Sequence, residues 1–563
     1  MTNKKFVEQL LIKKAQLASD LVLDSIEVPV DSINGDFSYP VFKLSKTLRK
    51  APNIIAQDIV TKLQDEAFEK VVAVGGYVNF YLNKDQFVSE ALKEINLADK
   101  TIGTGKNICI DYSSINIAKP MHIGHLSSTV IGGSLYRMYK YLGYGAIGIN
   151  HLGDWGTQFG KLIYAYLHWG NKKDVEERGI NCLLELYVKY HQVSETDPSI
   201  DDEARTWFLK IERGEPEAYE LFTWFKDITL KEVGRVYKML GIEFDSYNGE
   251  SFYNDKIPPV VEELKAKGLL EESDGAQVVK LEGMETPVLI LRSDGATLYA
   301  TRDLATAKYR KATYDFYKSL YVVAYQQNLH FRQVFGVLGK MGYDWVKDCI
   351  HVQFGMVSLK GGGNLSSRKG NVEFLEKILL DAVAKAKETI QQKNPDLANM
   401  QRVSEMVGVG AIVFGALSSG RIKDIVFDID KALEFEGETG PYIQYTHARC
   451  CSILQKSGMD VDASYVLDKK AKFIDVDTDT FELVKLLSRL DDTVAVALDK
   501  YEPSILARLM LDIAQAFNKF YITNHILSAE PDLKLARLQV VKLTQQVLKK
   551  GLELLLLQAP LEM

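Results

Sequence analysis

The sequence lacks the features of a membrane protein or of a protein from an oxidising compartment. Its 563 residues include five cysteines, an odd number, with no CxxC pair and no cluster at zinc-ligand spacing. No apolar run approaches the roughly 20 residues that cross a bilayer. The N-terminal segment mixes charged residues with leucines and lacks the continuous apolar core of a signal peptide. These absences predict a cytoplasmic protein with free thiols, no membrane contact and no protein-bound metal.

The composition is ordinary for a soluble protein of several domains. Apolar residues make up 46% of the chain and charged residues 25%. Because a domain usually holds on the order of 100–200 residues, the length predicts three or four units. The net charge of −7 does not decide whether nucleic acid binds. Charges more than about 10 Å apart are screened at physiological salt, so only a local basic face matters.

Changes in the apolar pattern divide the chain into an α+β, an α/β and an all-α part. Residues 1–105 surround the alternating strand VNFYL with helical patterns. Residues 106–435 alternate short apolar runs, NICIDY and GAIGIN, with helical stretches, which predicts a Rossmann-type parallel sheet. A helix-rich insertion occupies about 176–285, and the strand pattern continues through GAQVVKL, PVLILRS and SLYVVAYQQ. The helical spacing of apolar residues in 436–563 predicts an α-helical bundle.

A pair of histidines begins the helix that follows the first of these strands. The string AKPMHIGH places His122 and His125 three residues apart, on the same side of the first helical turn. Gly124 between them lets a ligand approach the backbone. Helix N-termini attract phosphate, and imidazoles can donate hydrogen bonds to a charged transition state. The motif indicates nucleotidyl transfer, although on its own it fits two helix-capping histidines equally well.

A basic, glycine-rich segment far downstream supplies a second half for such a site. Residues 358–371 read SLKGGGNLSSRKGN and include Arg368 and Lys369. Glycines allow a loop to move, and its cations can close on the β- and γ-phosphates of ATP. Alone, the segment would be a solvated surface loop. Together with the histidine pair, it predicts an ATP site.

The two motifs resemble the signature pair of class I aminoacyl-tRNA synthetases, and longer strings resemble the bacterial-type arginyl enzyme. The strings, in one order over nearly the whole chain, are DYSSINIAKPMHIGHLSST, NHLGDWGTQFGKL, LYATRD, YVVAYQQNLH, LSSRKGN and FEGETGPYIQYTHAR. The resemblance implies that L-arginine is activated with Mg²⁺-ATP to arginyl-adenylate and transferred to the 2′-hydroxyl of tRNA(Arg). It also implies a monomer, with residues 1–105 on the tRNA elbow and 436–563 on the anticodon.

The resemblance assigns roles to individual residues in these strings. It implies catalytic roles for Lys119, His122, His125, Arg368 and Lys369. It implies ATP binding by His122, Gly124, His125, Ser366, Ser367 and Lys369. It implies arginine binding by Asp111, Asn116, Tyr299, Asp303 and Gln327. A guanidinium keeps its charge and presents five donors in a plane, so carboxylate, amide and phenol oxygens suit it.

Several positions depart from the family pattern. Ile115 replaces a usual proline, Ser127 a usual arginine and Gly133 an acidic residue, while Asp111 stands where many members carry glutamate. Both lysines of the usual KMSKS-type loop are absent. These departures leave open a catalytically weakened paralogue that binds tRNA and regulates. A small-molecule adenylyltransferase is a third hypothesis, which gives the C-terminal helical region no role. The retained histidines and pocket residues favour the synthetase.

Overall fold

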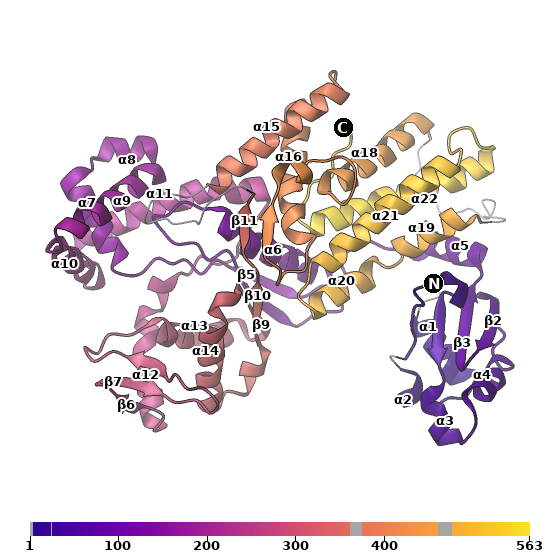
Figure 1. The fold of residues 1–563 in the computed structure, drawn as a ribbon, viewed down its shortest axis with the longest axis horizontal. Coiled ribbons are helices and arrows are strands. Elements are labelled where there is room, and N and C mark those ends of the chain that lie inside the picture. The colour runs from indigo at the N-terminus through magenta and orange to yellow at the C-terminus, as the bar shows by residue number, and fades with distance from the viewer. Residues whose placement is uncertain (1–3, 24, 361–373, 460–475) are drawn as a thin grey trace. The chain divides into compact units, whose positions relative to one another are not determined.

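The computed structural model of the protein describes residues 4–23, 25–360, 374–459 and 476–563, which form two compact units (Figure 1). The first unit contains residues 1–97, 449–490 and 512–547, and the second contains 98–448, 491–511 and 548–563. Three long helices contribute residues to both units: α18 (Gly440–Ser457), α21 (Ser504–Thr523) and α22 (Pro531–Leu554).

The first unit contains a small antiparallel sheet with the strand order β1–β3–β2. β1 (Phe37–Pro40) and β2 (Phe68–Val74) both pair with β3 (Tyr77–Leu82), which includes the expected strand VNFYL. Val78 and Phe80 of β3 are fully buried. The described helices of this part are α1 (Lys4–Lys13), α2 (Ser19–Val22), α3 (Phe42–Leu48), α4 (Pro52–Val60) and α5 (Lys84–Glu94).

Helix α19 (Thr478–Leu487) belongs to the same unit, although it comes from the C-terminal part of the chain. Asp477 caps its first turn. Phe481 packs edge-on against Phe87 of α5, with 5.7 Å between the ring centroids. Lys485 forms a 2.9 Å ion pair with Asp36. These contacts tie a C-terminal helix to the N-terminal sheet.

The second unit contains a four-stranded parallel sheet with the order β10–β9–β4–β5. Its strands are β4 (Asn107–Asp111), β5 (Gly145–Ile149), β9 (Phe316–Ala324) and β10 (Cys349–Phe354), which confirms the Rossmann-type sheet. Ile108 and Ile110 of β4 are fully buried, as expected for a strand covered on both faces. The sequence YQQ, which we expected to end β9, instead forms the short helix η4 (Tyr325–Gln327).

Helix α6 (Leu126–Tyr141) is the crossover between β4 and β5 and is buried almost throughout. A methyl group at Gly132 would lie 2.2 Å from the Tyr112 side chain. A methyl group at Gly133 would lie 2.3 Å from Ile242, with Leu556 also close. The ends of these two apolar side chains would have to shift to admit a larger residue at Gly133.

A group of helices follows β5 (Figure 1) and begins at residue 158, before the helix-rich insertion that the sequence predicted at about 176–285. They are α7 (Gln158–Trp169), α8 (Lys172–Arg178), α9 (Ile180–Thr196), α10 (Ile200–Glu212) and α11 (Pro216–Leu240). α7 packs on both α9 and α10. Gly160 of α7 lets the backbone of α10 approach closely, because a methyl group at Gly160 would lie 2.0 Å from the Ala204 carbonyl oxygen.

The segments GAQVVKL and PVLILRS do not continue the parallel sheet, contrary to our expectation. GAQVVKL contains β7 (Ala276–Val279), and PVLILRS contains β8 (Val288–Leu291). These two strands and β6 (Glu271–Ser273) form a separate antiparallel sheet. Asp274 and Gly275 both have positive φ and join β6 to β7. So short a turn permits only antiparallel pairing, since parallel strands need a long crossover. This sheet packs on α12 (Ile257–Ala266), α13 (Tyr299–Tyr314) and α14 (Asn328–Lys340).

The C-terminal part is helical in the residues that the structure describes, as expected from its sequence pattern. Before it, α16 (Met400–Leu417) packs on α15 (Leu375–Lys393) and α6. Among the described helices, α16 is the one that is long and apolar enough to cross a membrane, but 67% of it is buried within the protein. Its packing is that of a core helix.

Two helical glycines provide a test of the packing. Gly160→Ala should lower the free energy of unfolding by about 1–3 kcal/mol, because its methyl group meets backbone that must move. Gly234→Ala in α11, where no atom lies within 4 Å of the added methyl, is the control. It should stabilise the protein by about 0.5–1 kcal/mol through helix propensity. Thermal unfolding followed by circular dichroism measures both; equal midpoints would contradict close packing of α7 on α10.

Candidate active site

Strand β4 pairs with β5 on one side and with β9 on the other. The direction in which the chain adds strands to the sheet therefore reverses at β4. Ligands of open α/β sheets bind at such a point, outside the carboxyl ends of the strands. The segments that follow these strands are residues 112–125, 150–157 and 325–330. All of them belong to the second unit, and they contain six of the thirteen residues that the sequence singled out: Asn116, Lys119, His122, Gly124, His125 and Gln327.

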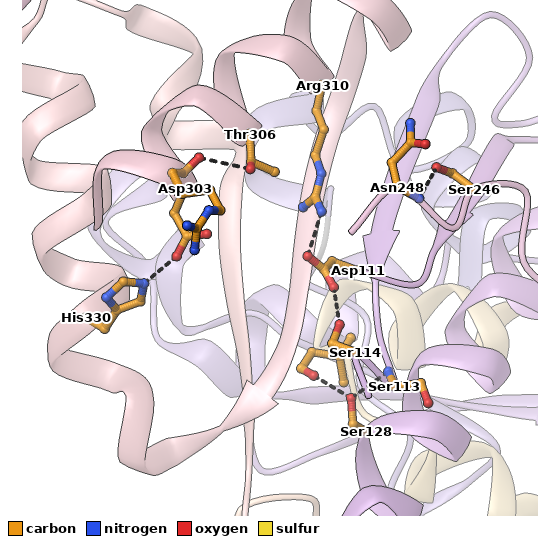
Figure 2. A network of polar contacts seen from close by, with 12 residues as sticks. Asp111, Ser113, Ser114, Ser128, Ser246, Asn248, Asp303, Thr306, Arg310 and His330 are labelled. Atoms are coloured by element: carbon orange, nitrogen blue, oxygen red, sulfur yellow. Dashed lines mark hydrogen bonds and ion pairs between the residues drawn. The ribbon is translucent and has the colours of Figure 1, made fainter. Parts of the chain in front are cut away.

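The segment after β4 has an unusual backbone. Ser113, Ser114 and Ala118 have φ values of 70°, 44° and 61°, although none is glycine. Hydrogen bonds hold this conformation: the Ser113 N–H donates to the Ser128 hydroxyl at 2.9 Å (Figure 2), and the Ala118 N–H donates to Thr229 at 3.0 Å. Left-handed backbone in non-glycine residues is costly and concentrates at functional sites.

Asn116 lies in the middle of this segment and contacts the loop after β5. It forms a bridge with Gly153, and the Gly153 N–H donates to the Ile115 carbonyl at 2.8 Å. A methyl group on Gly153 would lie 2.4 Å from the Asn116 amide oxygen. The structure thus places Asn116 where the loops after β4 and β5 meet.

The two histidines form one compact turn. η2 (Ile123–His125) follows His122, and the two rings lie 4.0 Å apart between centroids. The Gly124 N–H donates to His122 Nδ1, and the His122 N–H donates to His125 Nδ1, both at 3.1 Å. Because each Nδ1 accepts a hydrogen bond, the proton of each neutral ring is on Nε2. Each ring therefore presents an Nε2–H donor.

Burial and charge keep both rings neutral. Burial, the nearby His122 and Lys119 lower the pKa of His125 to about 3. Burial and Lys119 also lower the pKa of His122. Lys119 is thus close enough to act on both rings, and its ammonium group lies 5.7 Å from the centre of the Tyr187 ring of α9. The structure brings together three residues for which the sequence predicted catalytic roles.

Four residues predicted for the ATP site lie outside the described residues: Ser366, Ser367, Arg368 and Lys369. The chain on either side of them is described. β11 (Val357–Leu359) packs against η2. Phe374 forms a bridge with His122, and the Leu375 N–H donates to the Met121 carbonyl at 2.9 Å. Both flanks of the basic segment therefore lie beside the histidine turn.

Asp111, at the end of β4, is held by an internal cation. Arg310 of α13 lies 2.8 Å from its carboxylate, and the Ser114 hydroxyl donates to it at 2.7 Å (Figure 2). Burial by itself would raise the pKa of Asp111, but Arg310 and the neighbouring His151 hold it below its ordinary value. Arg310 is fully buried and lies over the ring of Tyr321. The charge of Asp111 is therefore already compensated within the protein.

Tyr299 is the first and Asp303 the fifth residue of α13, and residues four apart lie on the same side of a helix. Asp303 Oδ2 lies 2.5 Å from Nε2 of His330, the third residue of α14 (Figure 2). Tyr299 is 66% exposed and lies near the charges of Glu250 and Asp303. Gln327 is exposed at the end of η4, three residues before His330.

The charges of Asp111 and Asp303 act on the same half-buried histidine, His151. Burial lowers the pKa of His151, and the charges of Asp111, Arg310, Asp303 and Asp154 act on it in turn. Asp154 is itself fully buried, and its carboxylate accepts a 2.6 Å hydrogen bond from Lys226. This part of the site is therefore rich in carboxylates. Among the described residues, no three histidine, cysteine, aspartate or glutamate side chains are grouped to hold a metal ion.

Glu250 is a pocket residue that the sequence analysis missed. It begins η3 (Glu250–Lys256) and pairs with Arg302 at 3.3 Å. Burial raises its pKa to about 7, despite the opposing effect of Arg302, and the nearby Asp303 and Asp154 contribute. Glu250 lies in none of the family-like strings, and it reaches the site because its segment pairs with the end of β5 through Ser246. His330 and Asp154 lay within such strings but were not singled out.

The sequence matches three family models. They are the catalytic domain of class I (R) tRNA synthetases over residues 87–429, the DALR anticodon binding domain over 443–563 and the arginyl tRNA synthetase N-terminal domain over 4–82.

Relatives and solved structures agree. A protein of Alkaliphilus metalliredigens named arginine–tRNA ligase is 49% identical over 553 residues, 96% of each chain. One of Halothermothrix orenii with the same name is 48% identical over 99% of this chain and 100% of that one. The structure of Thermus thermophilus arginyl-tRNA synthetase superposes with a TM-score of 0.84 and 25% identity over 100% of both chains. The chain therefore belongs to the class I arginyl-tRNA synthetases.

Proposed function

We propose that the protein is an arginine–tRNA ligase, which activates L-arginine with ATP and transfers it to tRNA(Arg). The observation that carries the proposal is that the turn with the neutral rings of His122 and His125 and a group of carboxylates around His151 both lie at the carboxyl end of the sheet. The histidine turn suits phosphoryl oxygens, and the carboxylates suit a guanidinium. The match to an anticodon-binding domain supports tRNA as the acceptor. We also propose that the enzyme acts as a monomer in the cytoplasm.

ATP would bind with its phosphates against the histidine turn. The Nε2–H groups of His122 and His125 would donate to phosphoryl oxygens that gain charge as the arginine carboxylate attacks the α-phosphate. The ammonium group of Lys119 would add a positive charge at the same place. Gly124, Ser366 and Ser367 would contact the nucleotide, and Arg368 and Lys369 the departing pyrophosphate. Mg²⁺ would enter as the ATP complex, carried by the phosphate oxygens.

Arginine would bind between α13 and the loops after β4 and β5. Asp303 would accept from the guanidinium, with Tyr299 and the newly found Glu250 beside it. Asn116, Gln327 and Asp111 would line the end of the pocket nearer the histidines, where the amino and carboxylate groups of the substrate belong. The α-phosphate and the attacking carboxylate would then meet at the end of β4.

The alternative of a weakened regulatory paralogue has no observation in its favour. The histidine turn and Lys119 lie together, and Asp303 is present near the carboxylates around His151. An aminoacylation assay with total tRNA and each of the twenty amino acids tests the proposal. Charging of tRNA with arginine alone is expected; no charging, or charging with another amino acid, would overturn it.

Replacement of Asp303 tests the arginine pocket. Asp303→Asn should raise the KM for arginine by at least about a hundredfold, because a guanidinium that loses its charged partner costs several kcal/mol. The KM for ATP should change little. Asp315→Asn, at the exposed opposite end of α13, is the matched control and should leave both constants unchanged. An unaltered KM for arginine in Asp303→Asn would remove Asp303 from the pocket.

Replacement of Lys119 tests the histidine turn. The segment Ser366–Ser367 lacks the lysine that other class I loops carry, so Lys119 should supply the missing charge in the transition state. Lys119→Ala should lower kcat by about 10²–10³ and leave the KM for ATP nearly unchanged. Ser367→Lys in the same background should recover part of the loss. Lys172→Ala on the exposed α8 serves as control; wild-type charging by Lys119→Ala would disprove the role.

A further inference from the structure

Helix α11 contacts the loops that follow β4 and β5, through side chains on one of its faces. Lys226 donates at 2.6 Å to the fully buried carboxylate of Asp154, in the loop after β5. Thr229, one turn later, accepts the N–H of Ala118 at 3.0 Å, in the loop after β4. Because residues three apart lie on the same side of a helix, a single face of α11 holds both loops.

Tyr237, two turns beyond Thr229, extends the same face of α11. Its hydroxyl forms a 2.8 Å hydrogen bond with the Ser113 hydroxyl and accepts the side-chain N–H of Asn150 at 2.9 Å. Ser113 and Ala118 are the first and last of the left-handed residues after β4, with φ values of 70° and 61°. Helix α11 therefore contacts this strained segment at both of its ends.

The Thr229 side chain is fully buried, and its hydroxyl proton is already used. The hydroxyl donates to the Phe225 carbonyl at 2.8 Å, within the helix. A hydroxyl has one hydrogen and two lone pairs, so the oxygen of Thr229 meets the Ala118 N–H only as an acceptor. Left-handed backbone is unfavourable for alanine, and a buried hydrogen bond that forms only in this conformation helps to hold it.

Lys119 follows Ala118 directly and precedes Pro120. A residue before proline is restricted to extended backbone, because the proline ring clashes with its other conformations. The direction in which the Lys119 side chain leaves the chain is therefore set by the backbone of Ala118 on one side and by a stiff proline on the other. The charge of Lys119 acts on both His122 and His125, so this direction decides where a cation stands beside the histidine turn.

We propose that Thr229 is a positioning residue for the activation of arginine: its hydroxyl holds the left-handed backbone of Ala118 and thereby directs the ammonium group of Lys119 to the α-phosphate in the transition state. The inference rests on the proposed function, in which Lys119 supplies that charge. No step of the reaction uses Thr229 itself, so its replacement should act through Lys119. Misplacing a catalytic group by about 1 Å can lower a rate about a hundredfold.

Thr229→Val tests the inference, because valine has nearly the shape of threonine but accepts no hydrogen bond. This variant should lower kcat in aminoacylation about 10- to 100-fold, by no more than Lys119→Ala does, and leave the KM values for ATP and arginine nearly unchanged. Thr229→Ser restores the acceptor and should charge tRNA at nearly the wild-type rate. Thr223→Val is the matched control, since Thr223 lies on the exposed side of α11, donates to the carbonyl four residues earlier in the same way and should lose nothing.

A double variant separates a role through Lys119 from a general structural role. Lys119→Ala leaves no ammonium group to direct, so adding Thr229→Val to it should lower kcat by less than about a further threefold. Losses that multiply would overturn the inference, as would a wild-type kcat in either single variant.

If Thr229→Val does not fold, Thr229→Cys takes its place, because a sulfur atom accepts hydrogen bonds only weakly. It should give a smaller loss of kcat that again disappears in the Lys119→Ala background, and an unchanged kcat in this variant would also overturn the inference. Failure of the wild type to charge tRNA with arginine would instead contradict the proposed function.

Discussion

A buried carboxylate at the carboxyl end of a parallel sheet needs a charged partner. Removing an ionised group from water without compensation costs more than a protein's net stability can carry. The structure pairs Asp111 with the fully buried Arg310, Asp154 with Lys226 and Glu250 with Arg302. Helix α13 carries Arg302, Asp303 and Arg310, so it supplies two of these three cations together with the acid that we propose for the guanidinium.

The histidine turn, where we propose that phosphate binds, depends on the backbone rather than on charge. Left-handed residues at Ser113 and Ser114 turn the chain after β4, and hydrogen bonds to α6 hold that turn. The histidine rings then accept backbone N–H groups through Nδ1, which fixes the side of each ring that can donate. Burial keeps these rings neutral. Donors fixed before the substrate arrives need no reorganisation during the reaction.

The departures from the family pattern differ in how far packing and charge account for them. Gly133 packs closely against the side-chain ends of Ile242 and Leu556, which would have to shift to admit a larger residue. Asp111 reaches Arg310 and Ser114 despite its shorter side chain. Nothing in the structure explains Ser127. The missing loop lysines concern residues outside the described range, so their replacement by Lys119 stays a prediction.

The sequence by itself determined the elements whose pattern is local. The apolar runs of β4, β5 and β9, the spacing of α6 and the turn from Tyr299 to Asp303 follow from side-chain periodicity, and the strings around His122 identified the family. Only the tertiary structure decided which charges meet. Strand β7 pairs antiparallel with β6 because a two-residue turn joins them, and β8 pairs with β7 in the same separate sheet. Glu250, Arg310 and His330 reached the pocket through contacts between distant segments, and periodicity carries no information about such contacts, because it reports which face of an element is buried and not what lies opposite it.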